Sequence, residues 1–250
     1  MDQQLLAGFC TGQENLDLIK AVSGEDFRSV LDIGGHKLGA GIAFALLGKH
    51  VTSITIGDYW PKRMQPVCRM LEIDYRDCEF EKMEPQAGFN AIWASHVIEH
   101  SRNVGAFLDR CFDLLKDGGW LFVVVPPFKH QVVQGHVAPG WNIGLLVYNL
   151  LAGGFNVKDG HFLSHGYNII AAVQKTSQTP VRYHEELFAP PYLDLWPVAF
   201  DPKAGFDGNL REMNWPQGYR DRMEQDLSVL RNVGSGATGE VLDALPELWG

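Results

Sequence analysis

The chain has 250 residues, of which 46% are hydrophobic and 20% are charged. This ordinary globular composition excludes global disorder, and the length allows one large domain or one domain with an appendage. The formal net charge of −9 disfavours general binding to nucleic-acid phosphates. The longest apolar runs, such as Ile42–Leu47 and Leu121–Pro127, are too short to span a bilayer, so no membrane association is predicted.

The N-terminus and the cysteines both favour a reducing, cytoplasmic location. The N-terminal segment has no basic region and carries acids early, unlike a secretory signal. The four cysteines occur singly, without a C-x-x-C pair, at Cys10, Cys68, Cys78 and Cys111. This spacing fits neither a disulfide framework nor a zinc ribbon.

Apolar periodicity predicts alternating strands and helices up to residue 175. The expected strands are Arg28–Ile33, Val51–Ile56, a weaker Asp77–Glu81, Phe89–Ala94, Trp120–Val125, Phe155–Phe162 and Tyr167–Lys175. The expected helices are Asn15–Val22, His36–Leu47, Pro61–Leu71, Asn103–Leu115 and Trp141–Leu151. Strands that alternate with helices indicate parallel βαβ units, whereas the last two strands lack room for a crossover and must be antiparallel. The predicted fold class is α/β, a doubly wound, mostly parallel seven-stranded sheet ending in an antiparallel hairpin.

The rest of the chain has a different composition. Residues 176–250 hold seven of the 13 prolines and three of the seven tryptophans. The tryptophans Trp196, Trp215 and Trp249 argue against a disordered tail, because disordered segments are poor in aromatic residues. We therefore predict a domain of residues 1–175 and a C-terminal extension, 176–250, that packs on this domain or on a partner subunit.

The first candidate site is at the end of the first predicted strand. Asp32 lies near the end of this strand, and Gly34 and Gly35 follow it before a helix begins. Glycines there let a ligand approach the main chain and the N–H donors of a helix start. His36 stands where G-x-G-x-x-G requires its second glycine, and no P-loop motif is present, so the nicotinamide and P-loop fingerprints are missing. A plain tight βα turn is the alternative.

The second candidate is Asp58, which follows the second predicted strand. An acid at this point can accept hydrogen bonds from both hydroxyls of a ribose. The alternative is an ordinary loop aspartate that faces solvent.

The third candidate is the segment Phe89–His100, followed by an amphipathic helix, the sequence Leu115-Lys116-Asp117-Gly118-Gly119 and a strand. This order resembles the class I S-adenosylmethionine-dependent methyltransferases, especially the branch with an S-H-V-[LI]-E-H signature followed by L-K-x-G-G-x-[LF]. The specific part of the resemblance covers Phe89–Pro127. It extends more weakly over Asn15–Lys175 and does not cover 176–250.

The resemblance implies S-adenosylmethionine as the cofactor. It assigns Asp32, Gly34 and Gly35 to the glycine-rich motif, Asp58 to the ribose, Glu81 to the neighbourhood of the adenine, and Ser95 and His96 to the methionine part. His36 departs from the family pattern, because it replaces the usual second glycine.

The run His96-Val97-Ile98-Glu99-His100 also matches the zinc-peptidase pattern H-x-x-E-H. That chemistry needs a helix that places both imidazoles on one face, whereas this run follows directly on a strand end. A structural role for Glu99 and His100, capping the loop into the next helix, is a further alternative. No metal site is predicted.

Catalytic candidates come from histidines near strand ends, because ligands in this topology bind beyond the carboxyl ends of the strands. His130 and His136 lie on the loop after the Trp120–Val125 strand. A neutral imidazole there could take a proton from a substrate hydroxyl. We rank His136 first and His130 and His100 next, with ordinary loop histidines as the alternative for each.

These residues and the resemblance predict methyl transfer from S-adenosylmethionine to an oxygen of a small polar acceptor, such as a sugar or glycan precursor or a secondary metabolite, with a nitrogen as the less favoured acceptor atom. The alternatives are a non-catalytic or RNA-directed protein of the same fold, and the net charge of −9 disfavours the RNA-directed one. A homo-oligomer formed through the extension is compatible with the sequence but has no motif to support it.

Overall fold

The computed structural model describes residues 6–8, 10, 12–84, 88–138, 140–197 and 205–225. The chain forms two compact units. The first unit comprises residues 1–84 and 216–250, and the second comprises residues 85–215.

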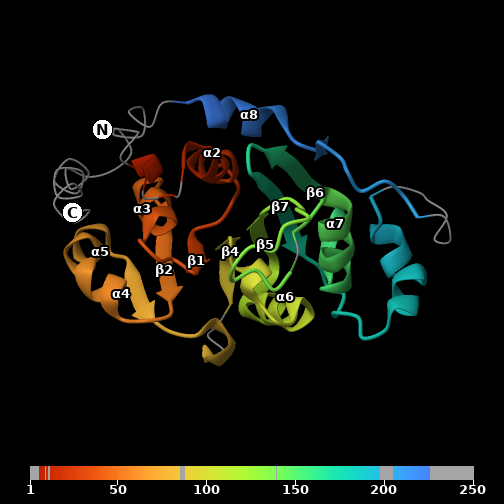
Figure 1. Ribbon diagram of the computed structural model, residues 1–250, viewed down its shortest axis with the longest axis horizontal. Coiled ribbons are helices and arrows are strands. Elements are labelled where there is room, and N and C mark those ends of the chain that lie inside the picture. Colours follow the sequence, from red (N-terminus) through yellow and green to blue (C-terminus); the bar gives the residue numbers. More distant parts are fainter. Residues whose placement is uncertain are drawn as a thin grey trace. The chain divides into compact units, whose positions relative to one another are not determined.

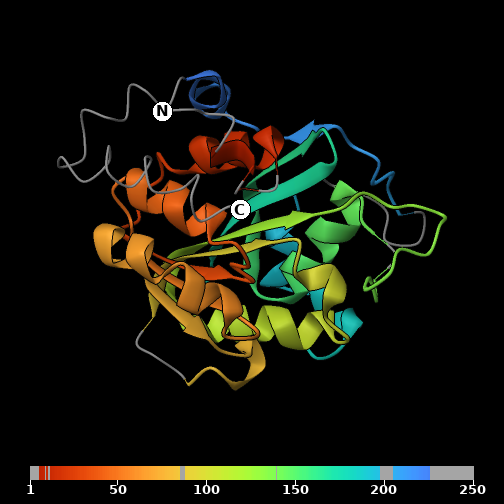
Figure 2. The same ribbon diagram turned by 60° about the vertical axis from the view of Figure 1, so that its left-hand side comes forward.

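The first unit is built on three parallel strands in the order β3-β2-β1 (Figures 1 and 2). They are β1 (Ser29–Ile33), β2 (His50–Thr55) and β3 (Asp74–Asp77). The apolar side chains of β1 on both of its faces, including Val30 and Leu31, are fully buried. Burial on both faces explains why apolar residues stand at adjacent positions rather than alternating with polar ones.

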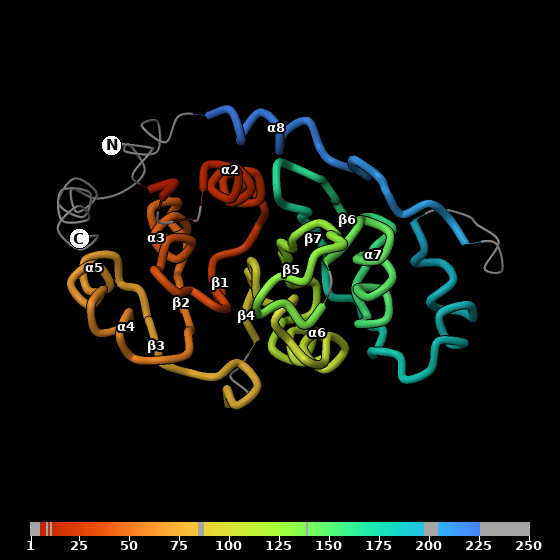
Figure 3. The backbone as a smooth tube through the Cα atoms, viewed as in Figure 1, coloured from red at the N-terminus to blue at the C-terminus, as the bar shows by residue number. Residues whose placement is uncertain are grey.

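The described part of the first unit also contains the helices α2 (Gln13–Val22), α3 (Gly39–Leu46), α4 (Tyr59–Arg63), α5 (Gln65–Leu71) and α8 (Gln217–Glu224). Although α8 is distant in sequence, it packs against α2 (Figure 3). Arg222 donates from Nε to the carbonyl of Ala21 at 2.7 Å, and Lys20 donates to the carbonyl of Gln225 at 3.1 Å. Part of the Pro- and Trp-rich region therefore packs within this unit.

Two helices of the first unit differ from the prediction for local reasons. The predicted helix Pro61–Leu71 is two helices that meet at Met64. Pro66 has no N–H to continue the helical hydrogen bonds, so the chain starts a new helix there. Helix α3 begins at Gly39 rather than at His36, because His36 and Leu38 have positive φ angles of 34° and 65°.

The predicted strand Asp77–Glu81 is wrong. The strand in this region is β3, which ends at Asp77, and a 3-10 turn, η1 (Phe80–Lys82), follows it. All four residues of β3 are at least partly exposed. A short, polar edge strand carries none of the apolar signal by which sequence patterns locate strands.

Within its described residues, the second unit contains five strands in the order β4-β5-β7-β6-β8. They are β4 (Phe89–Ser95), β5 (Leu115–Val125), β6 (Phe155–His165), β7 (Asn168–Lys175) and β8 (Glu212–Met213). Strands β4 and β5 are parallel, whereas the β5–β7, β6–β7 and β6–β8 pairs are antiparallel. Parallel strands followed by antiparallel C-terminal strands confirm the predicted fold class. The described chain has eight strands rather than seven, because the short β8 adds to β6.

Two helices of the second unit start at asparagine caps. Asn103 Oδ1 accepts from the N–H of Ala106 before α6 (Val104–Leu114), and Asn142 Oδ1 accepts from the N–H of Leu145 before α7 (Ile143–Ala152). Helix α7 packs on β6 (Figure 1). Side-chain caps satisfy N–H groups that the first turn of a helix leaves without partners.

The extension also contributes to the second unit. Two 3-10 turns, η3 (His184–Phe188) and η4 (Tyr192–Leu195), precede Trp196. Trp196 is buried, its Nε1 donates to the carbonyl of Leu187 at 2.9 Å, and its ring stacks on that of Phe188. Trp215 is also buried, whereas Trp249 lies outside the described residues. The division at residue 175 stays a prediction.

Two further expectations concern the whole described chain. Its cysteines are free thiols, three of them buried. None of the described helices combines the length and the apolar character needed to cross a membrane.

Candidate functional site

The glycine loop after β1 requires both of its glycines. The N–H groups of Gly34 and Gly35 both donate to the carbonyl of Ile54 at 2.9 Å. Gly34 has a φ of +76°, a conformation that costs glycine little. A Cβ on Gly35 would lie 1.9 Å from the Ser53 hydroxyl oxygen, so a side chain there would force the loop away from β2.

Asp32 lies beneath this loop rather than at its surface. Its side chain is buried, and its carboxylate accepts from the Ser53 hydroxyl at 2.8 Å and from the N–H of Gly41. Burial raises the pKa of Asp32 to about 6, because desolvation outweighs the two hydrogen bonds that lower it. Asp32 therefore ties the end of β1 to β2 and to the first turn of α3, and thereby fixes the shape of the glycine loop.

His36, the residue that departs from the family pattern, is held by two aromatic side chains. The Tyr75 hydroxyl donates to the His36 carbonyl, and the His36 ring meets the Trp60 ring edge-on, with centroids 5.6 Å apart. Burial lowers the pKa of His36, with a smaller effect from Lys37, so the imidazole is neutral at pH 7. Sequence reasoning did not select Trp60 or Tyr75, because only the fold brings them to this loop.

The two remaining candidate acids of the first unit are at its surface. Asp58 is exposed at the start of α4, where it forms an ion pair with Lys62. Gly57, just before it, has a φ of +92° and donates to Asp77 Oδ1 at 2.8 Å. Glu81 is exposed in η1. Asp58 thus follows β2 with a carboxylate that solutes can reach, as a ribose-binding acid would require.

In the second unit, Ser95 ends β4 and His96 turns the chain with a φ of +53°. The His96 Nε2 atom lies 2.7 Å from Asn168 Oδ1, and Nδ1 lies 3.2 Å from Glu99 Oε1. Burial alone would lower the pKa of His96, but its interactions with Glu99 and Asn168 outweigh burial and raise it. Because both ring nitrogens face oxygen atoms, the geometry favours an imidazolium ion.

Glu99 and His100 belong to a 3-10 turn, η2 (Ile98–His100), that follows His96. The Glu99 side chain is fully buried, and one of its oxygens lies 4.0 Å from His100 Nε2. The other ring nitrogen of His100 lies 2.7 Å from the carbonyl oxygen of Gly135. A carbonyl oxygen only accepts, so Nδ1 carries the proton of the neutral ring and Nε2 directs its lone pair toward Glu99.

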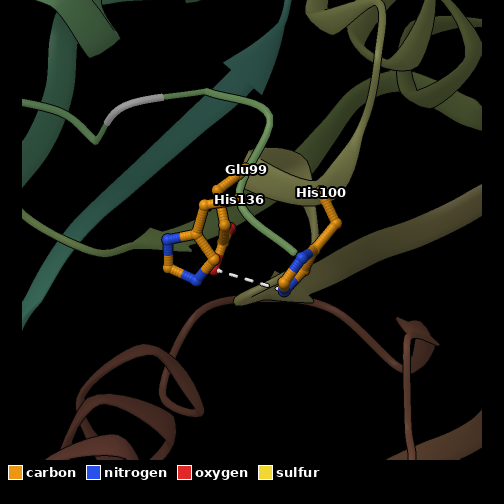
Figure 4. Close-up of side chains that lie close together, drawn as sticks. All are labelled: Glu99, His100 and His136. Carbon is orange, nitrogen blue, oxygen red and sulfur yellow. Dashed lines mark ion pairs between the residues drawn. The ribbon is translucent and has the colours of Figure 1, made fainter. Parts of the chain in front are cut away.

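The structure brings together two of the three catalytic candidates. The rings of His100 and His136 meet edge-on with centroids 5.0 Å apart, beside Glu99 (Figure 4). His130 is exposed, with its ring against Phe128. His100 and His136 are 36 positions apart in the sequence, and no sequence motif predicts that their rings are in contact.

The geometry argues against two alternatives for the H-x-x-E-H run. The imidazoles of His96 and His100 do not share an α-helical face, because His96 has a positive φ and a 3-10 turn follows. Moreover, His96 Nε2 is engaged by Asn168. The side chain of Glu99 does not cap α6, since Asn103 does so.

Comparison with known proteins identifies the family. A family model described as a methyltransferase domain matches residues 10–156, which is more than half of the chain. The chain therefore belongs to this family, and the resemblance to class I S-adenosylmethionine-dependent methyltransferases is confirmed.

Curated relatives match a shorter part of the chain. An enzyme named ubiquinone biosynthesis O-methyltransferase from Bradyrhizobium sp. (strain ORS 278) is 35% identical over 99 residues, 38% of each chain. The enzyme of the same name from Xylella fastidiosa (strain 9a5c) is 37% identical over 101 residues, 38% of this chain and 40% of that one. The chain thus matches well under two thirds of the length of these relatives.

Solved structures share the fold at low sequence identity. The 1,6-didemethyltoxoflavin-N1-methyltransferase of Burkholderia thailandensis has a TM-score of 0.55 at 16% identity, over 70% of this chain and 80% of that one. The N-methyltransferase NodS of Bradyrhizobium japonicum WM9 has a TM-score of 0.53 at 15% identity, over 66% and 86%. The [4+2]-cyclase SpnF has a TM-score of 0.55 at 15% identity, over 69% and 92%. This fold therefore accommodates more than one reaction.

Proposed function

We propose that this protein transfers a methyl group from S-adenosylmethionine to an oxygen of a small polar acceptor. The observation that carries the proposal is the family match over residues 10–156, which includes both the glycine loop and the Ser95–His100 segment. The curated relatives are named as O-methyltransferases, which favours oxygen over nitrogen.

The first unit offers groups suited to the cofactor. We assign the main chain of Gly34 and Gly35 to close contact with it, and the exposed Asp58 carboxylate to the two ribose hydroxyls, in exchange for its ion pair with Lys62. Asp32 positions the loop from below. The contacts assigned to Glu81, Ser95 and His96 stay predictions.

The cofactor supplies a methyl group on a sulfonium sulfur, so the protein mainly orients two ligands and excludes water. An acceptor hydroxyl must also lose its proton as it attacks. In the second unit, His136 and His100 are the preferred bases, and the lone pair of His100 Nε2 is available because Nδ1 faces the Gly135 carbonyl. His130 is the weaker candidate, because it lies outside this pair.

The acceptor that we propose is a sugar or glycan precursor or another small hydroxylated metabolite. A non-catalytic or RNA-directed protein of the same fold is the second candidate, and the cyclase named above supports the view that the fold alone does not determine the reaction. The net charge of −9 argues against RNA.

The test is incubation of the purified full chain with methyl-labelled S-adenosylmethionine and a panel of sugars, phenols and amines. We expect S-adenosylhomocysteine and a labelled methyl ether in the presence of a hydroxylated acceptor. Label transferred only to amines would contradict the oxygen assignment. Label transferred only to RNA would contradict the small-molecule assignment.

A further inference from the structure

The Glu99 carboxylate is unusual among the buried polar groups of the described chain. Its side chain has no exposed surface, and neither oxygen accepts a hydrogen bond of good geometry from the described residues. The charged or chargeable groups recorded beside it are imidazoles, His96 at 3.2 Å and His100 at 4.0 Å. The His96 imidazolium compensates part of this buried charge, but Oε2 has no hydrogen-bond partner among the described residues, which leaves room for a second cation at the carboxylate.

Three side chains converge at this carboxylate. One donor atom from each of Glu99, His100 and His136 lies within 4.8 Å of the others (Figure 4). We propose that these three residues form a binding site for one divalent transition-metal ion of the Zn²⁺ class.

A local hydrogen bond holds His100 in the arrangement that a metal needs. The carbonyl of Gly135 lies 2.7 Å from Nδ1 of His100 and fixes the tautomer, so that Nε2 presents a lone pair. Metal-binding histidines characteristically donate from their other nitrogen in this way.

The third ligand is tied to the same turn through the main chain. The carbonyl of Glu99 accepts from the N–H groups of Val137 at 2.7 Å and Ala138 at 3.0 Å. These bonds hold the loop of His136 against η2. Donor atoms around one zinc ion lie about 3–3.5 Å apart, so the site must contract by roughly 1 Å, which rotation of the half-buried His136 ring can supply.

The donor set selects the class of metal. Two neutral imidazoles and one carboxylate suit Zn²⁺ and neighbouring transition metals, whereas Mg²⁺ and Ca²⁺ prefer oxygen ligands alone. Three protein ligands leave at least one position for water or for another oxygen ligand. The site differs from that of a zinc peptidase, because here Glu99 is a ligand and His96 is not.

The consequence for catalysis rests on the proposed function, whereas metal binding does not. An acceptor hydroxyl at the open position would be acidified by the cation and would release its proton to water, leaving the oxygen bound as an alkoxide. His100 and His136 would then be ligands rather than bases. The metal-bound oxygen would be the nucleophile for the methyl group.

The test is titration of the EDTA-treated full chain with Zn²⁺ by calorimetry, without cofactor or acceptor. We expect about one Zn²⁺ per chain, and an affinity at least ~10-fold weaker in His136→Ala and in Glu99→Gln, since even loss of a supporting group costs that much. His184→Ala is the matched control, because this exposed histidine is paired with Glu185 in the same unit. Its Zn²⁺ affinity should equal that of the wild type.

Thermal unfolding of each metal-free variant checks its folding, and His136→Ala keeps the test valid if Glu99→Gln does not fold. Absorption of the Co²⁺-loaded protein separates imidazole and carboxylate ligands from the four cysteines. No Zn²⁺ binding, equal binding by wild type and His136→Ala, or a thiolate spectrum would each overturn the site. Methyl transfer that persists in EDTA would overturn only its catalytic role and would leave the proposed function intact.

Discussion

Two buried carboxylates, one in each unit, differ in the groups that surround their oxygen atoms. Asp32 accepts from a hydroxyl and from a backbone N–H. Glu99 has no well-aligned donor and faces imidazoles instead. Two donors satisfy Asp32, whereas Glu99 depends on cationic partners, namely the His96 imidazolium and the metal ion proposed above. The comparison indicates that Asp32 shapes a loop and that Glu99 forms part of a site.

The largest expected effect comes from the loop that Asp32 supports. In Gly35→Ala, the new Cβ would lie 1.9 Å from the Ser53 hydroxyl oxygen. We expect a loss of about 3 kcal/mol in the free energy of unfolding, measured by urea denaturation, together with weaker S-adenosylmethionine binding. Gly105→Ala is the control, because its nearest neighbour is at 3.5 Å. Equal stability of the two variants would contradict the close packing at Gly35.

The next effect concerns the charge of Asp32. Burial raises its pKa to about 6 in the folded protein from an ordinary value of 3.8, so between these values the folded state binds more protons than the unfolded state. The free energy of unfolding therefore falls as the pH rises from about 4 to 6, by about 2–3 kcal/mol. Asp32→Asn should remove this fall. Relative to the wild type, the thermal midpoint of the variant should therefore rise between pH 4 and pH 7. Parallel pH profiles for the two proteins would show that Asp32 is not buried as described.

A smaller effect should follow when Asp32 loses one donor. Ser53→Ala removes the hydroxyl that donates at 2.8 Å and should cost about 1–2 kcal/mol at pH 7 by urea denaturation. At pH 4, where Asp32 is protonated, the cost should shrink. A cost that does not depend on pH would assign the effect to packing rather than to the carboxylate.

The smallest effect lies in the second unit and sharpens the contrast with Glu99. Asn103→Ala removes the cap of α6, whose side chain accepts from Ala106, and should cost about 1 kcal/mol by thermal unfolding. Because Asn103 is not among the proposed ligands, Zn²⁺ affinity should not change. A parallel loss of affinity would mean that the Zn²⁺ measurements report general stability.

Most of the fold was predictable because its buried elements carry strong apolar patterns. The strands β1 and β4 and the helix α6 appear close to their expected positions, and β5 ends at Val125 as expected but begins at Leu115 rather than at Trp120. The failures are at polar or interrupted segments, namely the exposed β3 and the break before Pro66. Where burial does not impose a pattern, the sequence gives no comparable signal.

The candidate site was less predictable. The motif residues Asp32 and His96 could be selected by resemblance, but the burial of Asp32 and the contacts of His96 depend on Ser53 and Asn168. The meeting of Glu99 with His136 depends on a loop that closes on η2 through main-chain bonds. Contacts of this kind arise from the tertiary fold and have no fixed spacing in sequence.

The central claim is that this chain binds S-adenosylmethionine through the loop that Gly34 and Gly35 shape. Calorimetric titration of the full chain with S-adenosylmethionine tests it most directly, with Asp58→Ala as the companion variant. The account predicts one bound cofactor per chain and markedly weaker binding by Asp58→Ala at unchanged thermal stability. Absence of binding to the folded wild-type protein would contradict the account.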